Sequence, residues 1–163
     1  MEIIYSPEHR RQHGRAELTD GLMVPVYEHP GRLDAILEAL GRRGFPEPVE
    51  PEDRGLEPII AVHDPAYVAF LQCAWDEWVA AHGPDGDALP LSWRAPGMRD
   101  DREPARIDGR LGHWSFDAGT PITAGTWAAA YAAAQAADTA RRRVTTGAQA
   151  AFALARPPGH HAG

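Results

Sequence analysis

Two stretches of the chain carry apolar residues at the three- and four-residue spacing of an α-helix, and a third is rich in alanine. Together they limit what the chain can fold into. The first follows Pro30, the second covers residues 67–79, and the third is the alanine-rich stretch 127–143. Asp64 is a candidate N-cap for the second stretch. The third ends in three arginines, which suit the negative end of a helix dipole. These stretches predict helices.

Two short apolar segments predict β-strands. Residues 1–6 carry adjacent isoleucines, and residues 152–155 run into a bend rich in proline and glycine. Residues 8–29 are too irregular in pattern for a regular element, so we expect a first loop there. Gly41 and Gly44 are expected to end the helix that follows Pro30.

Residues 83–109 hold four prolines, four glycines and charges of both signs. This composition interrupts the helical spacing and predicts a long loop. A long loop within a folded domain usually carries function or an interface. The same composition is also typical of a disordered segment.

Composition favours a single folded domain over residues 1–163, since 44% of the residues are hydrophobic. The formal charge of −7 disfavours nucleic acid and anionic membranes and is compatible with a cationic small molecule. Cys73 is the one cysteine, so no internal disulfide can form, and a cytoplasmic protein is expected. No stretch of about 18 apolar residues predicts a membrane span.

His160 and His161 stand side by side just after the predicted strand 152–155. Histidine transfers protons near neutral pH, and α/β proteins commonly place catalysis beyond the carboxyl ends of their strands. A pair of histidines is not a specific pattern, however. It is equally compatible with two surface side chains in a flexible tail.

The surrounding residues carry a family resemblance. "RPPGHHAG", residues 156–163, resembles the tandem-histidine motif of the histone deacetylase and acetylpolyamine amidohydrolase superfamily. "TPITAGTW" at 120–127 and "VHDPAYVAFL" at 62–71 resemble two further segments of that superfamily. "AELTDGLMVPVYEHPGRLDAILEAL" resembles the first loop of the bacterial acetylpolyamine amidohydrolases. The similarity covers essentially the whole chain.

The resemblance implies an α/β fold of the arginase and deacetylase type, with helices on both faces of a parallel sheet. Only the N-terminal portion of that fold is expected here, so residues 1–163 would form the N-terminal part of a single deacetylase-like domain. The loop 83–109 corresponds to a region that packs against a neighbouring subunit in the polyamine-specific enzymes. A homodimer is therefore expected.

The resemblance also implies roles for individual residues. His161 would act as general base, and His160 would assist it electrostatically. Glu17 and Asp117 are candidate substrate-binding residues at a tunnel mouth, where they would attract the ammonium groups of an acetylpolyamine. Glu17 also fits an ordinary solvated loop carboxylate, and aspartate is a common turn residue, as at Asp117.

Zinc is the cofactor that the resemblance implies, with ligands expected downstream of Gly163 and none assigned in this chain. Six further histidines lack the tight spacing of a zinc site and read mostly as loop or surface residues: His9, His13, His29, His63, His82 and His113. Trp75 and Trp78 fit the core face of their helix.

Three functional hypotheses remain open. The leading one is a zinc-dependent amide hydrolase that removes acetyl groups from acetylpolyamines or acetyl-lysine. The second is a catalytically inactive, truncated deacetylase-like module that binds or dimerises through residues 83–109. The third is an arginase-like or acetoin-utilisation-type member of the same fold. The first loop argues against it, because that loop is similar to the first loop of the amidohydrolases.

Overall fold

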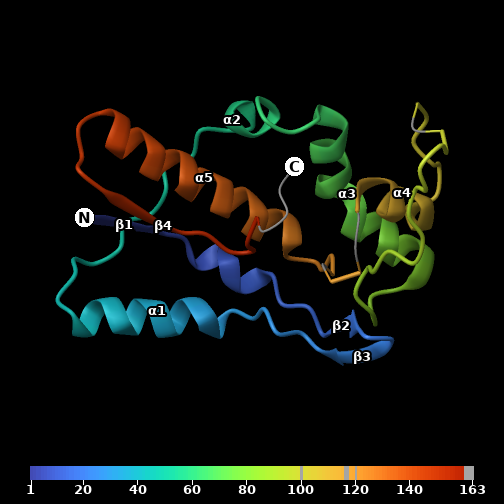
Figure 1. The fold of residues 1–163 in the computed structure, drawn as a ribbon, viewed down its shortest axis with the longest axis horizontal. Helices are drawn as coiled ribbons and strands as arrows, with labels where there is room; N and C mark the ends of the chain where they lie inside the picture. Colours follow the sequence, from blue (N-terminus) through green and yellow to red (C-terminus); the bar gives the residue numbers. More distant parts are fainter. Residues whose placement is uncertain (100, 116–117, 120, 160–163) are drawn as a thin grey trace. The chain divides into compact units, whose positions relative to one another are not determined.

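The computed structural model describes residues 1–99, 101–115, 118–119 and 121–159 (Figure 1). The chain divides into two compact units, the first with residues 1–13, 28–62 and 125–163 and the second with residues 14–27 and 63–124. The first unit contains β1 (Glu2–Tyr5), the 3₁₀ helix η1 (Pro7–Arg11), α1 (Gly31–Arg42), α2 (Glu57–Ile60), α5 (Thr126–Thr145) and β4 (Ala151–Leu154). The second contains β2 (Ala16–Thr19), β3 (Leu22–Pro25), α3 (Pro65–His82) and α4 (Ile107–Trp114).

A parallel strand pair forms the centre of the first unit. β1 pairs with β4 in a register that sets Glu2 beside Ala151 and Tyr5 beside Leu154. On the other side of β1, Val49 forms an isolated parallel bridge with Ile4. The two predicted strands, distant in sequence, are thus neighbours, and β4 lies one residue earlier than predicted.

Helices cover both faces of this strand pair, as Figure 1 shows for α5 and α1. On one face Ile3 packs with Leu33 of α1 and Leu154 of β4. On the other face Ile4 packs with Ala136 and Ala140 of α5. Adjacent residues of a strand point to opposite faces, so the Ile3-Ile4 pair of the first segment joins both cores. The expected α/β architecture is confirmed.

The second unit has its own core between α3 and α4. Phe70 and Ala74 of α3 pack against Ile107 and Leu111 of α4, together with Ala88 and Ile122. Trp75 and Trp78 are half-buried against this cluster, which confirms their assignment to the core. That residues 1–163 belong to one domain stays a prediction, because the two clusters of the first unit and the cluster of the second are made of different residues.

Residues 8–29 contain regular structure that the sequence pattern did not predict. After η1, the strands β2 and β3 pair in antiparallel register, with Thr19 beside Leu22. The turn between them is Asp20-Gly21, and both residues have positive φ, 51° and 80°. A two-residue turn of this kind matches the twist of a hairpin. The expectation of an irregular loop was therefore wrong.

The predicted long loop is shorter than expected, because α4 begins at Ile107. Two of its described residues make specific contacts with other parts of the second unit. Ala88 forms an antiparallel bridge with Ile122, and Glu103 accepts hydrogen bonds from Trp114 Nε1 at 2.9 Å and Arg110 Nε at 2.7 Å. Ala88 and Glu103 thus fix two points of this segment, whereas Leu91, Trp93 and Met98 between them are exposed.

Helix ends follow the sequence signals with one exception. Asp64 accepts a hydrogen bond from the Ala66 amide at 2.7 Å, which confirms it as the N-cap of α3. α1 continues past Gly41, and the chain turns away at Gly44, where φ is 74°. None of the helices in the described part of the chain is both long and apolar enough to cross a membrane.

Candidate active site

The candidate site belongs to the edge of the first unit at which β1 and β4 both end. Because the strands are parallel, their carboxyl ends meet there, with Tyr5 beside Leu154. β1 continues into η1, and β4 continues into Arg156 and the segment that leads to the histidine pair. In α/β sheets this edge is the usual place for ligand binding. His160 and His161 themselves lie outside the described residues.

Arg156 ties this edge together and is 2% exposed. Its Nη1 donates hydrogen bonds to the backbone carbonyls of His9, at 2.6 Å, and Gln12. Its Nε donates to the carboxylate of Glu28, with which it forms an ion pair, and Nη2 donates to the Glu28 carbonyl at 3.3 Å. One buried side chain therefore joins the end of β4 to the end of η1 and to the segment before α1.

The sequence around η1 presents these carbonyls to Arg156. Ser6 caps the start of the helix by accepting a hydrogen bond from the Glu8 amide at 3.3 Å. The His9 carbonyl accepts a hydrogen bond from the Gln12 amide at 3.3 Å, and its second lone pair stays available to a nearby cation. Gln12, the C-cap residue, also receives a hydrogen bond from the Thr126 hydroxyl at the start of α5. η1 is thus held from two sides.

His9 was interpreted together with five other histidines as mostly loop or surface residues, and for His9 this interpretation was wrong. It is 2% exposed, and its Nε2 lies 3.0 Å from the Tyr5 hydroxyl. Nδ1 is buried and has no hydrogen-bond partner among the described residues. Burial, and then the positive charges of Arg10 and Arg156, lower the pKa of His9. A neutral ring is therefore favoured beside the buried guanidinium.

Of the two predicted carboxylates, the structure describes one. Glu17 is half-buried on β2, opposite Val24 of β3, so it belongs to a hairpin and not to an irregular loop. A strand gives its side chain a fixed direction, which a solvated loop would not. Asp117 lies outside the described residues.

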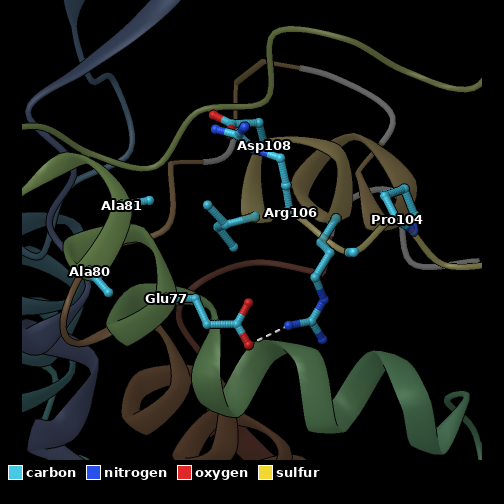
Figure 2. Close-up of a pocket in the computed structure, with 9 residues that line it drawn as sticks. Glu77, Ala80, Ala81, Pro104, Arg106 and Asp108 are labelled. Atoms are coloured by element: carbon cyan, nitrogen blue, oxygen red, sulfur yellow. Dashed lines mark hydrogen bonds and ion pairs between the residues drawn. The ribbon is translucent and has the colours of Figure 1, made fainter.

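The second unit contains an open groove of about 550 Å³ between α3 and the start of α4. In Figure 2 Glu77 points into it from α3, and the dashed line marks its ion pair with Arg110. Partial burial opposes the charge of Arg110, but hydrogen bonds to Glu77 and Glu103 raise its pKa above the ordinary value. Glu17, which is the predicted site residue that the structure describes, does not line this groove.

Metal ligands were not predicted in this chain. Within residues 1–99, 101–115, 118–119 and 121–159, no three histidine, cysteine, aspartate or glutamate side chains come together as a metal site would require. Catalytic zinc needs three protein ligands. The described residues alone therefore do not fit a zinc site, and we assign no ligand among them.

The parallel strands, the helices on both faces and the histidine pair after β4 define part of an α/β protein with its candidate site at the carboxyl edge. Residues 26–163 match the histone deacetylase domain. The chain thus belongs to the histone deacetylase family.

Individual relatives agree with this assignment. The chain is 48% identical over 162 residues to acetylpolyamine amidohydrolase 2 of Pseudomonas aeruginosa, covering 99% of this chain and 46% of the relative. It is 45% identical over 166 residues to acetylpolyamine amidohydrolase 1 of the same species, covering 100% and 47%. A crystal structure of acetylpolyamine aminohydrolase from Burkholderia pseudomallei, 34% identical, superposes with a TM-score of 0.90 over 99% of this chain and 46% of that one. The chain spans about half the length of these relatives.

Proposed function

We propose that the natural full-length protein containing this chain hydrolyses acetyl amides of small cationic amines, acetylpolyamines above all. The observation that carries the proposal is the match of the chain, at 45% identity or more, to two proteins named acetylpolyamine amidohydrolase. The resemblance of the first-loop sequence points to the same substrates. The net charge of −7 is compatible with a cationic substrate, although it supports solubility first.

In this proposal the histidine pair carries out the proton transfers of the reaction. His161 accepts a proton from the water that attacks the acetyl carbonyl and returns one to the leaving amine, while His160 assists it electrostatically. Zinc is part of the proposal as a cofactor whose ligands are expected downstream of Gly163. The sequence position of the pair, shortly after a parallel strand and four residues after the buried Arg156, supports these roles.

Glu17 is proposed to attract the distal ammonium group of the substrate, and Asp117 is proposed as a second, weaker contact. The strand position and partial burial of Glu17 support its role. A partly exposed carboxylate contributes little energy, about 1 kcal/mol or less, so its effect is one of preference between substrates.

The assay is deacetylation of acetylated putrescine and spermidine by the full-length protein, compared with a neutral acetyl amide of similar length. His161→Ala should lower kcat at least about 100-fold on every substrate. Glu17→Gln should lower kcat/KM up to about fivefold on the cationic substrates alone. The matched control is Glu38→Gln, which removes an exposed carboxylate on α1. Equal losses on both substrate types would reject the role of Glu17.

Absence of any deacetylation by the wild-type protein would reject the proposed function and favour an inactive binding module. The expected homodimer also stays a proposal, with residues 83–109 as its interface. Leu91, Trp93 and Met98 are exposed in that segment and support it. The molar mass in solution, measured by light scattering, tests it directly.

A further inference from the structure

Arg156 is buried and charged, yet packing of β4 does not require it. Strand β4 is already held by its pairing with β1 and by Leu154, which lies in the α1-side core. Burying a guanidinium has a large desolvation cost, and a buried ion pair often adds no stability over apolar residues of similar size. The presence of arginine here therefore calls for an explanation based on geometry.

The contacts of Arg156 supply that geometry. The guanidinium is planar and presents its N–H groups in a fixed fork. Here the fork reaches three residues in two chain segments: Glu28, through its carboxylate and carbonyl, and the end of η1, through the carbonyls of His9 and Gln12. A lysine ammonium is a single point of charge and cannot reproduce this set of directions. The position of the backbone at Arg156 is thus constrained from two sides, by the end of η1 and by Glu28.

The segment after Arg156 begins with two stiff residues. Pro157 and Pro158 each have φ restricted by their rings, and Gly159 then precedes the histidine pair. Because these two residues have little backbone freedom, the position of Arg156 restricts where Gly159 can lie. His160 is only four residues from the anchor.

We propose that Arg156 is a positioning residue for the histidine pair: its buried contacts with Glu28, His9 and Gln12 determine where residues 157–159, which precede the pair in sequence, leave the sheet. The role in catalysis rests on the proposed function, because Arg156 acts through His160 and His161. The role in placing the segment does not depend on it. The two parts can therefore be tested separately.

The first test needs no activity. Hydrogen–deuterium exchange of the full-length protein is compared between wild type, Arg156→Lys and Glu28→Gln, with Arg42→Lys as the control because Arg42 forms an exposed ion pair on α1. Arg156→Lys should speed exchange at Gly159 and in the following residues several-fold, and Glu28→Gln less so. Exchange in α1 should not change. Unchanged exchange from residue 159 onward in Arg156→Lys would overturn the proposal.

The second test uses deacetylation of acetylated putrescine. A misplacement of catalytic groups by about 1 Å can lower the rate about 100-fold. Arg156→Ala should thus lower kcat to that extent, Arg156→Lys should lower it less, and KM should change little in both. Added guanidinium ion, at non-denaturing concentration, should restore part of the rate to Arg156→Ala and none to His161→Ala.

The outcomes separate the two proposals. If the wild type is active and Arg156→Lys keeps full kcat, or if KM rises while kcat is unchanged, the positioning role is wrong. If the wild type deacetylates nothing, the proposed function fails, and the exchange experiment alone decides whether Arg156 places the segment. Arg156→Ala removes one partner of a buried ion pair and can therefore destabilise the fold. The thermal midpoints of Arg156→Ala and Arg156→Lys are measured to separate a loss of folded protein from a loss of kcat.

Discussion

Replacing Gly125 with alanine should damage the junction between η1 and α5. Gly125 is the residue just before α5, and its φ of −104° is open to alanine, so the backbone conformation itself is no obstacle. The obstacle is space. A Cβ atom at this position would lie 2.1 Å from the carbonyl oxygen of Arg11 and 2.4 Å from its carbonyl carbon. Both are backbone atoms and cannot rotate away.

The size of the effect can be worked out from these distances. To restore ordinary contact, the end of η1 and the start of α5 must separate by about 1 Å, and overpacking of this kind usually costs about 1–3 kcal/mol. The same movement would disturb the carbonyls of His9 and Gln12, which Arg156 holds. Gly125→Ala should therefore lower the free energy of unfolding and also the kcat of the proposed deacetylation.

A matched substitution elsewhere should have the opposite sign. Gly41 lies near the end of α1, where a Cβ atom would meet nothing within 4 Å. Gly41→Ala should raise the free energy of unfolding by up to about 1 kcal/mol, because alanine loses less conformational entropy in a helix. Urea unfolding of the two full-length variants and of the wild type measures both changes. Equal stability of wild type and Gly125→Ala would refute the steric reasoning.

Two further predictions concern single side chains. Asp64→Ala should lower the free energy of unfolding by about 1 kcal/mol through loss of the α3 N-cap, and Asp64→Ser should recover most of it in the same urea experiment; equal values for both variants would contradict the capping role. The pKa of His9 is lowered in the folded state, so the unfolded chain binds more protons below the unfolded pKa of about 6.5. The stability that neutral His9 contributes above that pH is therefore lost as the pH falls. On acidification the free energy of unfolding should fall more steeply for wild type than for His9→Gln, by up to about 1.4 kcal/mol per pH unit. Parallel pH curves for the two proteins would show that His9 does not titrate differently on folding.

The elements that could be predicted from the sequence are those whose signal is local. α1 and α3 were predicted from apolar spacing, α5 from its alanine content, and the Asp64 cap from a polar residue before a proline. The short helices α2 and α4 were not predicted. The β2–β3 hairpin was missed although its signal was present, since Asp20-Gly21 stands between short apolar segments. The irregular composition of residues 8–29 was given more weight than that dipeptide.

The buried groups at the candidate site could not be predicted in the same way. Arg156 and Glu28 are 128 residues apart in sequence, and nothing in the local pattern of either residue indicates its partner. His9 sits among charged residues and has no apolar spacing, so its burial depends on η1 packing against α5. Long-range contacts of this kind become visible only once the strands and helices have been placed.

The two faces of the β1–β4 pair differ in the size of the side chains that line them. On the α5 side the contacts are made almost entirely by methyl groups, from Ala136, Ala140, Ala151 and Ala153 around Ile4. On the α1 side leucines and aromatic rings fill the space. The backbone of α5 can therefore approach the strands closely, and any bulkier residue there would force the layers apart. Substitutions that change side-chain size should be tolerated more readily in the core between the strands and α1 than in the core between the strands and α5. A probe or label attached to this unit should therefore be placed on the α1 side.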